Sequence, residues 1–204
     1  MTKRERYAQH MKIAVLGTGS MGKTHASIYK NLTDGESVTI VGRDESKTKK
    51  IAKTLGIESS MNVSEILKDK SITVVDICMP TVLHRKFVLA ALRNNKHVFC
   101  EVPISYNVDD ATEMVRQAKV AKRIFQVAQL MRSVAELNFV AEKIKSEALG
   151  KILSVHLHRY QRYKVFEPII DLMGFDFDTV NYLLGVPISV LTTKSTRNGA
   201  EEFF

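Results

Sequence analysis

The chain has 204 residues, of which 45% are hydrophobic and 25% charged, as in ordinary globular proteins, and this length suits one full domain and part of a second. No apolar run approaches the roughly 20 residues that cross a bilayer, and residues 1–10 lack the apolar stretch of a signal peptide, so we expect a cytoplasmic protein without a membrane partner. The net charge is +8, but the lysines and arginines are dispersed, which argues against a nucleic-acid partner and suits a small ligand that carries several phosphates.

Apolar runs alternate with helical patterns through residues 1–128. After residues 1–10, which we expect to form a loosely ordered extension, strands alternate with helices of about 10–15 residues, a pattern typical of βαβ units and a parallel sheet. We therefore predict an α/β fold in which residues 1–128 form a Rossmann-type domain. The predicted strands are 12–16, 37–41, 72–77, 97–100 and 124–128, and the predicted helices are 23–32, 44–55, 82–94 and 108–121, with a short helix that begins at Asn62.

The pattern changes at residue 129. Two strands and two helices alone bury little apolar surface. We therefore expect residues 129–204 to be an incomplete α+β domain for substrate binding and oligomerisation, whose exposed strands favour a homo-oligomer. The predicted helices are 134–147 and 171–184, and the predicted strands are 152–160 and 188–196.

Two cysteines, Cys78 and Cys100, lie in apolar, strand-like surroundings. In a cytoplasmic protein this setting favours buried free thiols over a disulfide. We assign no metal site.

A glycine-rich loop follows the first predicted strand and precedes the first predicted helix. Gly17 permits a tight turn, Gly19 lets the backbone approach a pyrophosphate, and Gly22 allows close packing of helix on strand. The helix N-terminus adds free N–H groups. This context favours a nicotinamide dinucleotide site over a glycine-rich turn that binds nothing. The loop reads Gly17-Thr18-Gly19-Ser20-Met21-Gly22.

The end of the second predicted strand usually selects between NAD and NADP. An acidic residue there holds the ribose 2′-hydroxyl of NAD, whereas an arginine accepts the 2′-phosphate of NADP. Here Gly42 stands in the acidic position and Arg43 follows it. A guanidinium group can form two parallel hydrogen bonds with a phosphate, so we favour NADP. NAD is the alternative, with Asp44 on the ribose, although Asp44 is better placed to cap the next helix.

Several segments, in order, resemble the Gfo/Idh/MocA oxidoreductases, the glucose–fructose oxidoreductase and inositol dehydrogenase family. They are residues 17–25, 75–84, 95–103 and 171–185. The resemblance implies a Rossmann domain followed by an α/β domain whose open sheet carries substrate sites and subunit contacts. It also implies that Met79, Pro80 and His84 line the nicotinamide half of the cofactor and that Glu101 lies near the nicotinamide ribose. These residues follow predicted parallel strands, where open α/β sheets bind ligands.

The chain departs from the family pattern at two positions that the resemblance makes catalytic. Val102 replaces a lysine and Phe175 replaces a histidine, and neither can carry the hydroxyl proton that alcohol oxidation releases. With Arg132, these two positions are assigned to the substrate pocket. Asp171 is the catalytic candidate that remains, or the N-cap of its helix. Other candidate proton carriers are Tyr160, Tyr163, Lys164, His156 and His158.

The sequence therefore favours an NADP-dependent oxidoreductase that acts on a sugar, polyol or related hydroxy or keto compound. Because both polar partners of the reacting carbon are replaced, the alternative is a non-catalytic NADP-binding sensor or regulator. A dinucleotide-binding subunit of a larger assembly is a third reading. The preference for an enzyme depends on analogy with the family.

Overall fold

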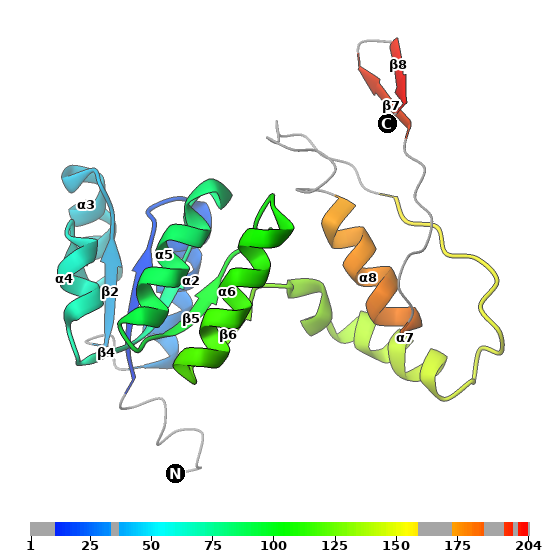
Figure 1. Cartoon of the computed structure of the whole chain (residues 1–204), viewed down its shortest axis with the longest axis horizontal. Helices are drawn as coiled ribbons and strands as arrows, with labels where there is room; N and C mark the ends of the chain where they lie inside the picture. The colour runs from blue at the N-terminus through cyan, green and yellow to red at the C-terminus, as the bar shows by residue number, and fades with distance from the viewer. Residues whose placement is uncertain (1–10, 34–36, 159–172, 186–193, 198–199, 204) are drawn as a thin grey trace. The chain divides into compact units, whose positions relative to one another are not determined.

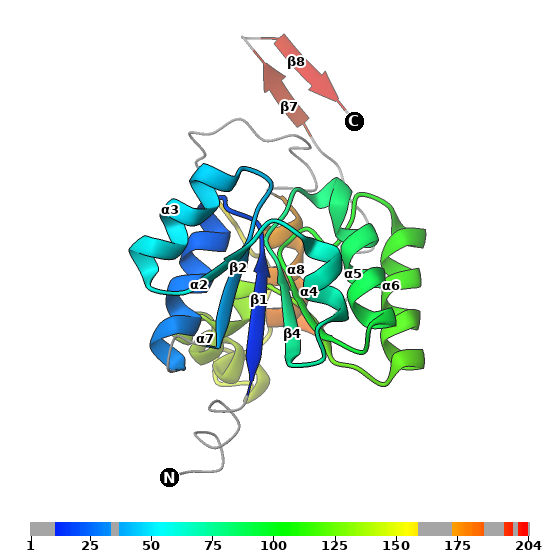
Figure 2. The same ribbon diagram turned by 90° about the vertical axis from the view of Figure 1, so that its left-hand side faces the viewer.

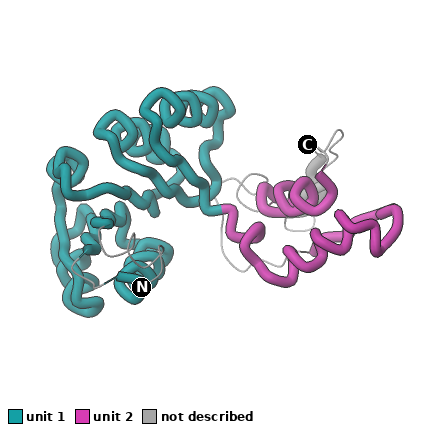
Figure 3. Tube along the Cα trace, turned by 90° about the horizontal axis from the view of Figure 1, so that it is seen from below, with its two compact units in different colours: residues 1–128 teal, residues 129–204 magenta. Residues whose placement is uncertain are grey.

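The computed structural model describes residues 11–33, 37–158, 173–185, 194–197 and 200–203. The chain divides into two compact units, residues 1–128 and residues 129–204, which Figure 3 colours separately.

Unit 1 is built on one parallel sheet of six strands in the order β3-β2-β1-β4-β5-β6 (Figure 1). This is the strand order of a dinucleotide-binding Rossmann fold, with a change of direction beside β1. The strands are β1 (Lys12–Leu16), β2 (Val38–Val41), β3 (Glu58–Ser60), β4 (Ile72–Ile77), β5 (His97–Cys100) and β6 (Phe125–Val127). The helices are α2 (Ser20–Leu32), α3 (Glu45–Leu55), α4 (Val63–Lys68), α5 (His84–Arg93) and α6 (Val108–Ala121), with a short 3-10 turn η1 (Thr81–Leu83) before α5.

Helices cover both faces of the sheet, as Figure 2 shows. Alternate residues of β1 point to opposite faces. Ile13 and Val15 pack in a cluster with Ala26 of α2 and Ile51 of α3. The intervening residues of β1 pack with the buried residues of α4, α5 and α6. The predicted α/β fold with a parallel sheet is confirmed, and the sheet is buried on both sides as a parallel sheet requires.

Local signals explain where several helices begin and end. Asp44 caps α3 by accepting a hydrogen bond from the Lys47 amide at 2.9 Å, and Gly56 ends the helix in the left-handed conformation. Asn62 caps α4 as its capping box predicts, with its side chain also bonded to Glu65. The predicted free thiols are confirmed: Cys100 is buried, Cys78 is partly buried, and neither forms a disulfide.

Unit 2 contains α7 (Ala135–Lys145) and α8 (Gly174–Leu184), a 3-10 turn η2 (Leu130–Ser133) and an antiparallel hairpin of β7 (Lys194–Arg197) and β8 (Ala200–Phe203). Both helices were predicted, although residues 171–172 lie outside the described residues. The strand predicted over 152–160 is wrong for its described part, because residues 152–158 have no regular structure. Leu153 is 87% exposed, and no described segment pairs with these residues to complete a ladder. Residues 188–193 of the last predicted strand are outside the described range.

Candidate functional site

The carboxyl ends of β1, β4 and β5 lie side by side at one edge of the sheet, because these three parallel strands are consecutive neighbours. The loop after β1 carries the glycines, residues 78–80 follow β4, and residues 101–103 follow β5. Parallel sheets bind ligands at this edge, where the strand order changes direction.

Two of the three loop glycines are required by close backbone packing. Gly17 has φ +130, and a Cβ there would lie 2.2 Å from the carbonyl oxygen of Cys78. A Cβ on Gly22 would lie 2.1 Å from the carbonyl oxygen of Gly17. Neither position can carry a side chain unless the backbone shifts, so the loop holds α2 tightly against β1 and β4.

Gly19 differs from the other two glycines because a Cβ there would meet nothing within 4 Å. It is the N-cap residue of α2, no side chain among the described residues caps this helix, and its first turn has no acidic residue. Ser20 and Met21 follow it in that turn and are both exposed. The amide groups of this turn are therefore open to an anion, and the helix dipole favours one. A pyrophosphate fits this surface, with Gly19 leaving room for close approach.

Residues 17–24 also have the spacing Gly-x-x-x-x-Gly-Lys-Thr of a phosphate-binding P-loop. The fold decides between the two motifs. Helix α2 already begins at Ser20, so Gly22 and Lys23 lie inside the helix and not in a loop that wraps a phosphate. The strand order of the sheet is also that of a Rossmann domain.

At the end of β2, a closely packed glycine is followed by an exposed arginine. A Cβ on Gly42 would lie 2.3 Å from Oγ1 of Thr48 and 2.5 Å from Cγ2 of Thr18, so packing against these two threonines requires glycine here. Arg43 is exposed and makes no hydrogen bond or ion pair with any residue the structure describes. Asp44, the alternative residue for binding the ribose of NAD, caps α3 with its side chain.

His84 joins the segments that follow β4 and β5. Its side chain is fully buried, with Nε2 2.8 Å from the carbonyl oxygen of Met79 and Nδ1 3.0 Å from that of Pro103. Both ring nitrogens thus face the backbone of the protein. Met79 is partly buried beside the core, and Pro80 is exposed. His84 holds these loops in place, so it would act on a nearby cofactor through them.

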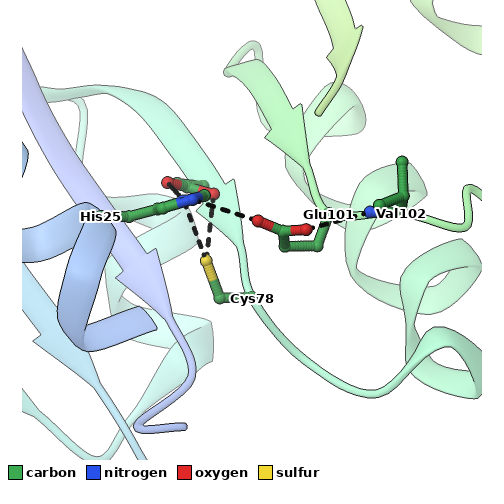
Figure 4. A network of polar contacts seen from close by, with 5 residues as sticks. His25, Cys78, Glu101 and Val102 are labelled. Atoms are coloured by element: carbon green, nitrogen blue, oxygen red, sulfur yellow. Dashed lines mark hydrogen bonds and ion pairs between the residues drawn. The ribbon is translucent and has the colours of Figure 1, made fainter. Parts of the chain in front are cut away.

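A polar network connects α2 to the ends of β4 and β5 (Figure 4). His25 of α2 forms ion pairs with two carboxylates, Nδ1 with Asp76 at 2.8 Å and Nε2 with Glu101 at 3.1 Å. The Cys78 sulfur lies 3.3 Å from His25 Nδ1 and donates to Asp76 at 3.4 Å. The other oxygen of Glu101 accepts the Val102 amide at 3.2 Å. The orientation of Glu101 is therefore fixed from both sides.

This network shifts the ionisation of its members. Hydrogen bonds to Asp76, Cys78 and Glu101 raise the pKa of His25 to about 12, so the imidazole stays protonated at neutral pH. Burial, which outweighs the hydrogen bond to His25, raises the pKa of the Cys78 thiol to about 12. The pKa of Tyr29, whose ring lies edge-on to that of His25, is also raised, mainly by burial and secondly by the negative charge of Asp76.

Sequence reasoning assigned no role to His25 or Asp76, although both lie inside segments that carry the family resemblance. The signal that could have revealed them is topological. Asp76 is in β4, and β4 lies between β1, which leads into α2, and β5, which ends before Glu101. Among the described residues, His25, Cys78 and Glu101 are also the group whose donor atoms lie close enough together to hold a metal ion.

The chain matches the family described as "Oxidoreductase family, NAD-binding Rossmann fold" over residues 11–129. It belongs to the Gfo/Idh/MocA oxidoreductases. A myo-inositol 2-dehydrogenase of Thermotoga maritima is 27% identical over 187 residues, which are 86% of this chain and 55% of that protein. The chain spans about half the length of the curated relatives it matches.

Two solved structures share this fold. Levoglucosan dehydrogenase, in complex with NADH and levoglucosan, has a TM-score of 0.78 at 23% identity, covering 93% of this chain and 58% of its own. A 3-ketoreductase from Actinomadura kijaniata, in complex with NADP and TDP-benzene, has a TM-score of 0.60 at 21% identity, covering 67% and 42%. At these identities the likeness shows the fold.

The residues expected to form the substrate side of this Gfo/Idh/MocA protein are divided between the units. Val102 is half-buried in unit 1, and Phe175 is half-buried on α8 of unit 2. Arg132 is engaged within unit 2: its guanidinium binds Asp178 through two contacts, at 2.9 and 2.5 Å, and lies 5.8 Å from the Tyr182 ring centroid. This ion pair holds η2 to α8.

The expected proton carriers of unit 2 are described only in part. The catalytic candidate Asp171 lies outside the described residues, as do Tyr160, Tyr163 and Lys164. His156 and His158 are exposed, in a segment without regular structure. Within the described residues, no helix is long and apolar enough to cross a membrane.

Proposed function

We propose that this Gfo/Idh/MocA protein binds NADP and transfers a hydride to or from a carbon that bears a hydroxyl or keto group, in a sugar, polyol or related compound. The observation that carries the proposal is the uncapped N-terminus of α2 behind Gly19, where a Cβ would meet nothing within 4 Å. A bound nicotinamide cofactor would supply the hydride chemistry. Relatives that include a myo-inositol 2-dehydrogenase support the substrate class.

The residues of unit 1 bind and orient the cofactor in this proposal. The amide groups at the start of α2 hold the pyrophosphate. Arg43, free among the described residues, binds the 2′-phosphate, and the capping role of Asp44 leaves the arginine as the better ribose-side contact. Met79, Pro80 and Glu101 flank the nicotinamide half. We keep NAD as the alternative cofactor.

The binding test exploits the space around Gly19. The chain has no tryptophan, so the fluorescence of NADPH itself reports binding against a low protein background. Gly19→Ala places a methyl group where the pyrophosphate approaches and leaves the protein packing intact. We expect at least a tenfold loss of NADPH affinity with an unchanged thermal melt. Gly174→Ala is the control, because a Cβ there also meets nothing within 4 Å. Equal NADPH affinity in Gly19→Ala and wild type would refute the proposed site.

Cofactor choice is tested at Arg43. Charge-assisted hydrogen bonds contribute about 1.5–3 kcal/mol, so Arg43→Ala should weaken NADPH binding by about tenfold or more and leave NADH binding nearly unchanged. Lys53→Ala removes the same charge from the last turn of α3 and should change neither affinity much. A wild-type protein that binds NADH more tightly than NADPH would overturn the choice of NADP.

A second candidate function is a non-catalytic NADP-binding sensor or regulator. It is favoured by Val102 and Phe175, which stand where the resemblance places a catalytic lysine and histidine. Nicotinamide absorbance, followed across a panel of ketones and polyols with saturating cofactor, separates the two. Turnover supports the enzyme, whereas tight binding without turnover supports the sensor. Homo-oligomerisation and a cytoplasmic location stay predictions.

A further inference from the structure

The network around His25 contains the donor types of a transition-metal site. His25 lies in α2, Asp76 and Cys78 lie at the end of β4, and Glu101 follows β5. One ring nitrogen of His25, the Cys78 sulfur and one Glu101 oxygen all lie within 4.8 Å of one another. Asp76 is adjacent to two of them, 2.8 Å from Nδ1 and 3.4 Å from the sulfur. One nitrogen, one sulfur and one carboxylate oxygen thus converge from three elements, and the Asp76 carboxylate lies beside the nitrogen and the sulfur.

The spacing suits a tetrahedral ion. Zinc binds nitrogen at about 2.0 Å and sulfur at about 2.3 Å, which places those two ligand atoms about 3.5 Å apart. The observed separation between His25 Nδ1 and the Cys78 sulfur is 3.3 Å. Imidazole and thiolate ligands favour zinc and cobalt over magnesium or calcium, which prefer oxygen ligands alone.

We propose that His25, Asp76, Cys78 and Glu101 form a binding site for one zinc-like divalent cation. The side chains of His25 and Glu101 are each 12% exposed, so an ion can reach them from solvent. The side chain of Asp76 is fully buried, so water cannot replace its hydrogen-bond partners in the network. The aromatic rings of Tyr29 and Phe99 pack against His25 and hold its orientation, as outer-shell groups do at metal sites.

Binding exchanges protons for the ion. Both ring nitrogens of His25 face carboxylate oxygens, so both carry hydrogens in the metal-free protein. A metal bond to one nitrogen displaces its proton, and a metal bond to Cys78 displaces the thiol proton. With two ionised carboxylates, the group has a net charge of about −1 before and after it releases two protons and gains a divalent cation. The buried Asp76 therefore keeps a compensating charge in both states.

Cobalt tests the site because a cobalt–thiolate bond absorbs strongly in the near ultraviolet. We titrate untagged, reduced 204-residue protein with Co²⁺ and expect this band to saturate at one ion per chain. Cys78→Ser should lose the band. Cys100→Ala removes the other cysteine, which is fully buried and outside the cluster, and should keep it. Circular dichroism confirms that both variants are folded.

Zinc provides a second readout that does not require the cysteine variant to fold. Titration with Zn²⁺ in weak buffer with a pH indicator should release about two protons per chain and should remove the cobalt band. The proposal is overturned if no cobalt band saturates near one equivalent, if Cys78→Ser keeps the wild-type band, or if zinc binding releases no protons. None of these readouts depends on NADP or on turnover, so they are independent of the proposed oxidoreductase function.

Discussion

The ion pair between His25 and Asp76 allows a quantitative test of what holds the ligand edge of the sheet together. Asp76 is fully buried and His25 is 12% exposed, with 2.8 Å between their atoms. Removing one partner of a buried pair costs about 3–5 kcal/mol because the other charge is left without compensation. In His25→Asn, Asp76 still accepts a hydrogen bond from the Cys78 thiol. We therefore expect a loss near the lower limit, about 3 kcal/mol in the free energy of unfolding.

The same variant has a defined pH dependence. The pKa of His25 is about 12 in the folded protein, against the ordinary value of 6.5, because of its hydrogen bonds to Asp76, Cys78 and Glu101. Its stabilising contribution is therefore complete below pH 6.5 and is lost progressively as the pH rises toward 12. The gap in unfolding free energy between wild type and His25→Asn should narrow by up to about 1.4 kcal/mol per pH unit above pH 6.5.

Urea unfolding at pH 6, 7 and 8, followed by circular dichroism, measures this gap below the ordinary cysteine pKa of about 8.5. His158→Asn, at an exposed histidine of unit 2, should stay within about 0.5 kcal/mol of wild type at each pH. Asp76→Asn added to His25→Asn should recover about 1 kcal/mol or more, because the lone buried charge is gone. A gap below about 1 kcal/mol at pH 6, or one that does not narrow between pH 6 and pH 8, would refute the reasoning.

Three further predictions concern other parts of the chain. Gly22→Ala should abolish NADPH binding and lower the free energy of unfolding, measured with urea, by about 1–3 kcal/mol, because the new Cβ would lie 2.1 Å from the carbonyl oxygen of Gly17. A stable variant that binds NADPH normally would contradict this. Lys96→Met should lower the free energy of unfolding by about 1–3 kcal/mol in the same measurement, because the buried ammonium group donates hydrogen bonds to two backbone carbonyls. An unchanged free energy of unfolding would show that water replaces the ammonium group. Arg132→Ala should lower the free energy of unfolding by less than about 1 kcal/mol despite the two contacts with Asp178, because Arg132 is 51% exposed and solvent screens the ion pair. A larger loss in a thermal unfolding measurement would contradict this expectation.

The architecture of unit 1 could be predicted from sequence because its signals are local and repeated. Buried parallel strands have continuous apolar runs, and the predicted strands at 12–16, 72–77 and 97–100 match β1, β4 and β5. The edge strand β3, Glu58–Ser60, was missed because it is short and polar, and it is held by pairing with β2. The opposite error occurred at 152–158, where alternation predicted a strand but no described segment pairs with it.

The candidate site was harder to predict because its residues are distant in sequence. The glycine loop is contiguous, so its role could be inferred from spacing alone. The contacts of His25 with Asp76 and Glu101 span 51 and 76 positions and depend on the order in which the strands pair. The lack of a partner for Arg43 among the described residues and the capping role of Asp44 are likewise visible only once β2 and α3 are placed.

The geometry of unit 1 also indicates why the proposed cofactor binding does not require a polar side chain at position 102. The groups proposed to hold the dinucleotide are mostly backbone: the amide groups of α2, and loop segments fixed by Gly17, Gly22 and His84. Val102 takes part in this framework through its amide, which donates to Glu101, so its side chain can change without moving the loop. In the proposed function, binding and proton transfer are therefore separable, and we expect a variant of the chain that lacks turnover still to bind the dinucleotide.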